Sequence, residues 1–438
     1  MQHERETPRG SDLPELKTRP PGEHSRTFLL RHRHAAAPMG PAKAAGGIVY
    51  ATAAGSNVVD VDGNHYVDLA AGFGAALIGH GHPAVLRALS LQSERLLHAL
   101  GDVHPSDAKI ALLERLGSLH PEPDAQVLLG QSGSDAVSAA LKTAVLATGK
   151  SGVLAFTGAY HGLGYGPLSA CGLRPSYREP FLAQLNPAVS FAPYPETREQ
   201  GAAAIEAVGR ALAEGNVGAV LVEPILGRGG VVVPPSGFLA ELSRLAAASG
   251  ALLIADEIWT GLGRSGAWLY SVAEGARPDL ICLGKGLGGG LPLSAVIGRR
   301  SVMAAWRREA EVVETSTFAG SPLACSTALA TLGVLGREKL VERSAALGAT
   351  WLAELREALV SAKDVRARGA GLMVGIDLGA HPGAGGAAVR SLLEQGFLAT
   401  TGGGQREVLV LTPPLTISEV QLAAATGAVV QAVREAVG

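Results

Sequence analysis

The sequence predicts an α/β fold with a mainly parallel, doubly wound sheet and a second, smaller α+β unit. Short apolar runs alternate with amphipathic stretches from about Val85 to Ala330, which is typical of strands and helices in turn. After Gly336 the pattern changes to helix, strands and helix. The chain has 438 residues, of which 47% are hydrophobic and 17% charged, so it can build a large core and more than one domain.

Six apolar runs are expected to be strands of the large sheet. They are Ala125–Leu129, Val153–Phe156, Val217–Val222, Ala251–Ala255, Leu280–Leu283 and Ser294–Ile297. The amphipathic stretches Ser134–Thr148 and Ser236–Ser249 are expected to be helices that cover the sheet. Upstream, Ser56–Val67 predicts a β-hairpin with its turn at Asp62-Gly63.

These patterns divide the chain into four parts. We expect an N-terminal extension or arm at 1–45, the first part of a small domain at 46–84, a large ligand-binding domain at 85–330 and a C-terminal small domain at 331–438. The stretch from Met1 to about Arg33 is rich in Pro, Arg and Glu and has little periodicity. It is expected to be poorly ordered, or to become ordered only against a partner subunit.

Charge and cysteine content narrow the class of protein. The 37 basic and 39 acidic residues give a net charge of −2 without a basic block, which disfavours nucleic acid and anionic membranes as partners. Cys171, Cys282 and Cys325 are far apart and odd in number, so they predict neither a disulfide framework nor a zinc site, and they favour the cytoplasm. No segment resembles a signal peptide or a membrane span.

The most informative feature is a carboxylate and an amine that follow two successive apolar runs. Asp256 ends one run, and Lys285 follows the next between Gly284 and Gly286. Both would lie on the rim where open α/β sheets bind ligands. Pyridoxal 5′-phosphate needs such a pair, because an amine forms a Schiff base with its aldehyde and a carboxylate keeps its pyridine nitrogen protonated. Taken alone, Lys285 could be a solvated lysine and Asp256 a helix cap.

Two further motifs allow a functional and a structural interpretation. The segment 130–135, with Ser134 in it, follows a strand and opens a helix, so its backbone N–H groups could bind a phosphate. An ordinary helix capped by Ser134 or Asp135 is the commoner case. Tyr160, after the next strand, could lie flat on a cofactor ring or pack in the core.

Together, and in this order, these segments resemble the class III aminotransferases. That family includes ornithine, 4-aminobutyrate and ω-amine transaminases, with glutamate-1-semialdehyde aminomutase as a relative. The resemblance extends from about Gly46 to the C-terminus, and it implies the PLP-dependent transferase fold type I with pyridoxal phosphate as cofactor. The segments that carry it are Asp60–Gly63, Gly79–Pro83, Ser132–Ser134, Tyr160–Gly162, Glu223-Pro224, Asp256–Ile258, Gly263–Gly266, Lys285, Thr317–Gly320 and Pro413–Leu415.

The resemblance implies a role for each matching residue. Lys285 would carry the Schiff base, and Asp256 would pair with the pyridine nitrogen. Ile258 and Tyr160 would lie on opposite faces of the ring. The remaining expected cofactor contacts are Ser132, Gly133 and Ser134 around the phosphate, with His161, Glu223 and Trp259.

The family pattern also bears on assembly and on metals. Thr317 would reach the phosphate of the neighbouring subunit, which implies a homodimer with shared active sites. His80 and His82 match a structural turn of the family, so no metal is expected.

The chain departs from the family at the positions that usually bind substrate carboxylates. Arg228 stands where many members have Glu, while Val410 and Leu163 stand where members have Arg. Arg228 is either a relocated anchor for an acidic co-substrate such as glutamate or pyruvate, or it is exposed or paired with Glu223. Arg406, on a glycine-rich loop, is a second candidate anchor.

Two other positions shape the expected pocket. Trp259 stands where several members have a Gln that binds the phenolic oxygen of the cofactor; its indole N–H can still donate, but its bulk narrows the pocket. Phe73 is either a wall of the pocket or a core residue.

We therefore expect an aminotransferase that moves an amino group from a terminal or side-chain amine to a keto acid or aldehyde. Lys285 would act as general base and general acid. An aminomutase or epimerase of the same fold is the first alternative. A non-catalytic binding protein on this fold is the alternative from another class.

Overall fold

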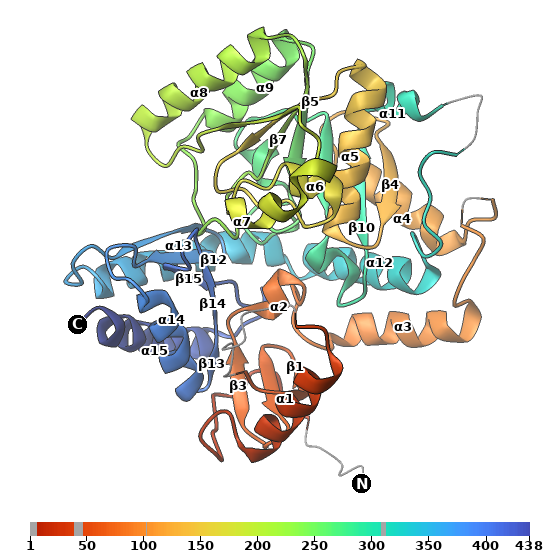
Figure 1. Cartoon of the computed structure of the whole chain (residues 1–438). Helices are drawn as coiled ribbons and strands as arrows, with labels where there is room; N and C mark the ends of the chain where they lie inside the picture. Colours follow the sequence, from red (N-terminus) through yellow and green to blue (C-terminus); the bar gives the residue numbers. More distant parts are fainter. Residues whose placement is uncertain (1–6, 39–46, 102, 308–311) are drawn as a thin grey trace.

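The computed structural model describes residues 7–38, 47–101, 103–307 and 312–438. A seven-stranded sheet forms the centre of the larger part of the molecule, and two four-stranded sheets lie beside it. In Figure 1 the large sheet occupies the upper half, while the N-terminal strands and the C-terminal helices lie side by side below it. The described residues contain no helix with both the length and the hydropathy of a membrane span.

The large sheet has the strand order β4-β10-β9-β8-β7-β5-β6. Its strands are β4 (Gln126–Gly130), β5 (Gly152–Phe156), β6 (Val189–Ala192), β7 (Val217–Val222), β8 (Leu252–Asp256), β9 (Leu280–Leu283) and β10 (Ser294–Gly298). Strands β6, β5, β7, β8 and β9 are parallel, whereas β10 is antiparallel to both β9 and β4. The six predicted strands are confirmed to within one residue at each end.

Helices cover both faces of this sheet because successive strand residues point to opposite sides. Val153 and Ala155 of β5 pack against α5 (Gly133–Thr148). Leu154 and Phe156 pack against the other layer, which contains α8 (Arg198–Ala213) and α9 (Phe238–Ala248). The predicted doubly wound arrangement and both predicted helices are thus confirmed.

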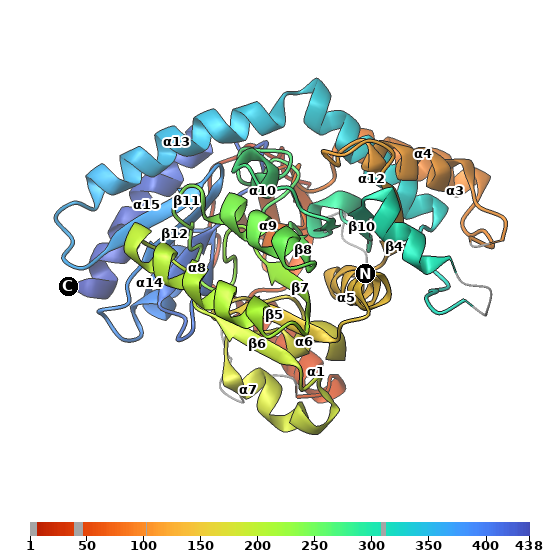
Figure 2. The ribbon, with the colours of Figure 1, turned by 90° about the horizontal axis from the view of Figure 1, so that it is seen from above.

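Shorter helical segments connect these elements. They are α6 (Tyr165–Ser169), α7 (Pro175–Arg178), η1 (Glu179–Gln184), α10 (Tyr270–Ala273), η2 (Lys285–Gly288), α11 (Arg300–Met303) and η3 (Ala304–Trp306). Between the N-terminal strands and the large sheet lie α2 (Ala71–Gly74), α3 (Pro83–Arg95) and α4 (Asp107–Gly117). In Figure 2, α3 and α4 lie at the opposite end of the molecule from the C-terminal helices.

The two small sheets join the beginning and the end of the chain. The first contains β1 (Tyr50–Ala54), β2 (Asn57–Asp60), β3 (His65–Asp68) and β13 (Phe397–Leu398), and the second contains β11 (Arg366–Ala370), β12 (Met373–Asp377), β14 (Thr400–Gly402) and β15 (Val408–Leu411). The predicted hairpin is β2–β3, and β13 pairs in parallel with β3. The surrounding helices are α12 (Pro322–Arg337), α13 (Leu340–Ala358), α14 (Ala384–Glu394) and α15 (Glu419–Val437). We propose that 46–84 and 331–438 form one small domain beside a large domain at 85–330.

The prediction of poor order in the N-terminal stretch is wrong for the residues that the structure describes. Residues 23–35 form α1 (Glu23–Ala35), and Glu15 forms a β-bridge with His65. The carboxylate of Asp62 accepts the backbone N–H groups of His24 and Ser25 and so caps α1. These partners are distant in sequence, so the stretch gains order without any local periodicity. Residues 1–6 and 39–45 of the predicted extension lie outside the described residues, as does residue 46 of the predicted small domain.

Candidate active site

A cavity of about 250 Å³ lies at the carboxyl ends of the parallel strands. Asp256 is the last residue of β8, and Lys285 begins η2 just after β9, so adjacent parallel strands deliver both groups to the same rim. The cavity is lined by Gly133, Ser134, Tyr160, His161, Gly162, Leu163, Glu223, Asp256, Ile258, Trp259 and Lys285. The structure therefore brings together the acid and the amine that the sequence singled out.

The Asp256 carboxylate is buried and held on both oxygens. Oδ2 lies 2.7 Å from Nδ1 of His161, and Oδ1 accepts the backbone N–H of Ile258 at 3.2 Å. The other ring nitrogen of His161, Nε2, is buried without a hydrogen-bond partner among the described residues. A buried carboxylate fixed in this way is suited to hold a cationic nitrogen at the cavity wall.

Burial lowers the pKa of Lys285 from 10.5 to about 8, although Asp256 and Glu223 nearby favour the charged amine and reduce the effect. A substantial fraction of the amine is therefore neutral at mildly alkaline pH, and only a neutral amine can attack an aldehyde. Lys285 has a positive φ of 44°, a conformation that is rare for a side chain of this size. Strain of this kind is common at functional sites.

The N-terminus of α5 forms one wall of the cavity. Ser132 is the N-cap, and its side chain and that of Asp135 form a capping box, so neither Ser134 nor Asp135 is the cap. Gly133 and Ser134 line the cavity, and the Ser134 hydroxyl accepts the backbone N–H of Gly164 at 3.1 Å. The positive end of the helix dipole thus lies where an anionic group would bind.

Glu223 is buried and occupied by backbone donors. Its carboxylate accepts the N–H groups of Tyr160 at 2.7 Å and Gly227 at 3.0 Å. Burial raises the pKa of Glu223 to about 7, and Asp256 adds to the effect. The guanidinium of Arg228 lies 4.5 Å from the centroid of the Tyr160 ring, which itself lines the cavity. Arg228 thus stacks on an aromatic wall of the site.

The remaining predicted site residues lie outside the lining of this cavity. Arg406 is exposed on its loop, with a positive φ of 62°. Phe73 is 55% exposed, so it is not a core residue, and it lines a neighbouring cavity of about 300 Å³ with Tyr50 and Phe397. Thr317 is exposed on the segment before α12.

Several contacts at the site were not predicted from the sequence. The His161–Asp256 pair joins residues 95 positions apart, and no local pattern signals it. Leu163 was noted only as a missing arginine, yet it lines the cavity. His80 and His82, which were expected to lie in a structural turn, are outside the cavity. His80 Nε2 lies 2.8 Å from the Asp68 carboxylate, and the side chain of His82 caps α3.

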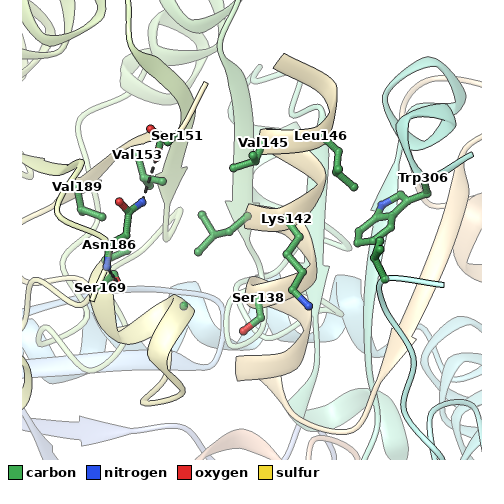
Figure 3. Close-up of a pocket in the computed structure, with 14 residues that line it drawn as sticks. Ser138, Lys142, Val145, Leu146, Ser151, Val153, Ser169, Asn186, Val189 and Trp306 are labelled. Atoms are coloured by element: carbon green, nitrogen blue, oxygen red, sulfur yellow. Dashed lines mark hydrogen bonds between the residues drawn. The ribbon is translucent and has the colours of Figure 1, made fainter. Parts of the chain in front are cut away.

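A larger cavity of about 590 Å³ lies on the outer face of α5 (Figure 3). Figure 3 shows Val145, Val153, Val189 and Trp306 around it, which makes its walls mainly apolar. Among its described lining residues Lys142 is the one charged side chain, and it is paired with Glu314. Of these two cavities, the smaller one therefore contains more groups able to exchange protons.

The smaller cavity fits pyridoxal phosphate on the basis of its own groups. It offers an amine, a buried carboxylate and a helix N-terminus, and two buried donors or acceptors, Trp259 Nε1 and His161 Nε2, have no partner within the described chain. Buried polar atoms without partners are rare in folded proteins, so a ligand with polar atoms is expected there.

Comparisons with known proteins agree with this chemistry. The family model described as Aminotransferase class-III matches residues 40–433. The acetylornithine aminotransferase of Methanosarcina acetivorans is 35% identical over 375 residues, which cover 86% of this chain and 89% of the relative. That of Mycolicibacterium smegmatis is 38% identical over 373 residues, with 84% and 89% covered.

Solved structures give the same result. The ornithine aminotransferase from Toxoplasma gondii, in a structure described as having partial PLP occupancy at the active site, has a TM-score of 0.83 and 29% identity, with 96% of each chain covered. A PLP-bound amine transaminase from an uncultivated Pseudomonas species has a TM-score of 0.84 and 28% identity, with 92% of this chain and 98% of that chain covered.

The fold and the cavity define a pyridoxal-phosphate-dependent transferase of fold type I. The chain belongs to the class III aminotransferase family, and it is an enzyme that transfers amino groups with pyridoxal phosphate as its cofactor.

Proposed function

We propose that this aminotransferase removes the amino group of a terminal or side-chain amine and passes it to a keto acid or aldehyde. The observation that carries the proposal is the convergence of Lys285 and Asp256 on one cavity. Two observations favour a terminal or side-chain amine as the donor. The curated relatives are named for acetylornithine, whose free amine ends its side chain, and Val410 and Leu163 provide no cation where the family commonly has arginine.

The residues of the cavity would hold the cofactor as follows. Asp256, fixed by His161, would keep the pyridine nitrogen protonated, and Gly133 and Ser134 at the N-terminus of α5 would bind the phosphate. Ile258 and Tyr160 would lie on the two faces of the ring. Further contacts are proposed for Ser132, Glu223 and Trp259. The bound cofactor supplies an electron sink for the carbon that carries the amine.

Lys285 has two proposed tasks. Its Nζ would hold the cofactor through the aldehyde carbon, and after the substrate amine displaces it from that carbon, the free Nζ would carry the proton that leaves the substrate carbon. Burial holds the pKa of Lys285 near 8, close to the operating range of a general base.

The half-reaction distinguishes transfer from isomerisation. The holoenzyme is mixed with one amine donor, such as N-acetylornithine, and no acceptor, and its visible spectrum is followed. A transaminase converts the cofactor to pyridoxamine phosphate stoichiometrically and loses the absorbance of the Schiff base. An aminomutase or epimerase turns over without net loss of that absorbance, and this result would reject the proposed function.

Arg228 is the proposed anchor for the carboxylate of the keto acid. Its guanidinium stacks on Tyr160, and the Arg228 backbone C=O accepts the N–H of Gly403, which fixes the loop beside it. The Arg228→Ala variant is expected to raise KM for a keto acid by about tenfold or more, with little change for an uncharged aldehyde acceptor. Arg406→Ala tests the second candidate anchor in the same way, and Arg210→Ala, at an exposed position on α8, is the matched control. An unchanged KM in Arg228→Ala would remove it from this role.

We also propose a homodimer with shared active sites, in the cytoplasm. Exposed apolar side chains gather on α3, on the segment after it and on the segment before α12: Leu86, Leu91, Leu96, Leu97, Leu100, Val312, Val313 and Phe318. Such an area commonly marks a protein interface. The three buried free cysteines are typical of a reducing compartment.

Thr317 provides a test of the shared site. If it completes the partner's phosphate site, Lys285→Ala and Thr317→Ala subunits should complement each other. Each variant alone loses activity, whereas a mixed dimer contains one site with both residues and should regain up to half of the activity per dimer. No recovery after verified subunit exchange, or a monomer in sedimentation, would reject shared sites.

A further inference from the structure

Trp259 is packed in a narrow slot between two glycine backbones. A Cβ added at Gly74 would lie 2.5 Å from Nε1 of the indole, and a Cβ added at Gly227 would lie 2.5 Å from Cε3. Both distances are shorter than any real contact, so the indole depends on glycine at both positions. Trp259 is only 7% exposed, and this packing fixes the plane of its ring.

The fixed ring presents one face to the amine of Lys285. Nζ lies 4.2 Å from the ring centroid, within the range of a cation–π interaction. Tryptophan has the strongest such interaction of the aromatic side chains, and the interaction is stronger where water is excluded. The indole face therefore favours the protonated amine over the neutral one.

Other charged groups act on the same nitrogen. Asp256 at the end of β8 and Glu223 after β7 favour the protonated form, whereas Arg228 in the following loop, Arg264 and burial itself disfavour it. The indole ring is uncharged, unlike these four residues, and it contacts the amine directly through its aromatic face.

We propose that Trp259 is a positioning residue for the catalytic amine, whose indole face holds protonated Nζ of Lys285 and so sets the pH at which the amine becomes reactive. This inference rests on the proposed function only in taking Lys285 as the amine that bonds the cofactor.

A purely space-filling role for Trp259 makes the opposite prediction. If the indole only excluded water, a smaller side chain would admit water, which stabilises the charged amine and raises its pKa. If the indole face binds the charged amine, its removal destabilises that form and lowers the pKa. The direction of the shift therefore separates the two roles.

The test uses the full-length apoprotein and pyridoxal 5′-phosphate. Protein and cofactor are mixed briefly at a series of pH values and reduced with borohydride, and the mass of the Lys285 peptide gives the initial rate of attachment. The rate rises with the neutral fraction of the amine. Trp259→Leu is expected to move the midpoint down by about one pH unit, and Trp259→Phe, which keeps an aromatic face, by less.

Trp306→Phe, on the far side of α5 in the cavity of Figure 3, is the matched control and should leave the midpoint unchanged. A second measurement avoids any substitution that could disturb the fold. Growth with fluorinated tryptophan weakens the π face without changing its shape, and mono- and trifluorination should lower the midpoint in steps.

The outcomes are distinguishable. An unchanged or raised midpoint in Trp259→Leu, or no response to fluorination, overturns the role of Trp259. Failure of the unsubstituted protein to attach the cofactor at Lys285 instead rejects the proposed function itself.

Discussion

Replacement of Lys285 by methionine should make the apoprotein more stable at neutral pH. Methionine keeps most of the length of the side chain and removes its charge. Burial lowers the pKa of Lys285 to about 8, while in the unfolded chain the same amine has its ordinary value of about 10.4. Keeping the amine charged at neutral pH therefore lowers the free energy of unfolding of the unsubstituted protein, and the methionine variant avoids this loss of stability.

The magnitude and the pH window follow from these two pKa values. Each unit of difference corresponds to about 1.4 kcal/mol, so the shift costs the folded state about 3 kcal/mol below pH 8, where the amine is charged in both states. Between pH 8 and about 10.4 the unfolded chain binds more protons than the folded one, so the cost declines as pH rises. Above that window the amine is neutral in both states and the cost is absent.

Urea unfolding of the two apoproteins measures this difference. Lys285→Met should exceed the unsubstituted protein in its free energy of unfolding by about 3 kcal/mol at pH 7, and the gap should close towards pH 10.5. Lys363→Met, at an exposed position, should show no such gap at either pH. A Lys285→Met protein that is equally or less stable at pH 7, or a gap that does not depend on pH, would refute the reasoning.

Two further predictions concern packing and buried polar groups. Gly227→Ala should destabilise the protein by about 1–3 kcal/mol and weaken cofactor retention, because the new Cβ would lie 2.5 Å from the Trp259 ring. Gly209→Ala on α8, where the new Cβ would have no neighbouring atom within 4 Å, should instead stabilise the protein by up to about 1 kcal/mol. Urea unfolding measures the stability of both variants, and dialysis of the holoenzyme measures how well each retains the cofactor. Equal changes in the two variants would contradict the packing argument. Asp60→Ala should cost about 3 kcal/mol, because the buried carboxylate accepts four hydrogen bonds, while Tyr66→Phe, which removes one of them, should cost about 1 kcal/mol in the same assay. A cost for Asp60→Ala no larger than that for Tyr66→Phe would show that the network contributes little.

The strands of the large sheet could be predicted because their signal is local. A strand buried on both faces is an uninterrupted apolar run, and β7, β8 and β9 are of this kind. Parallel pairing then places the residues at the ends of these runs on one rim, so the sequence alone assigns Asp256 and Lys285 to one site. The edge strand β6 was not predicted, because it is short and only partly buried.

The rest of the site depends on contacts that leave no local pattern. His161 reaches Asp256 from the loop after β5, and the N-terminal stretch obtains its order from the hairpin rather than from its own sequence. Asp12 illustrates this. Its backbone N–H donates to the side chain of Asn57, 45 residues away, and its backbone C=O accepts from the side chain of Gln421, 409 residues away. Composition indicated disorder there because the stabilising partners lie outside the stretch.

The positions at which this chain departs from its family lie together in space. Arg228 follows Gly227, whose backbone packs against Trp259, and Leu163 lines the same cavity as that indole. A tryptophan fits only because position 227 is glycine, and the arginine beside it stacks on Tyr160, which lines the cavity. Apart from Trp259, the residues proposed to hold the cofactor, Lys285 and Asp256 among them, match the expected family pattern. A change concentrated on one wall is expected when a different substrate is accepted while Lys285 and Asp256 keep the same cofactor chemistry.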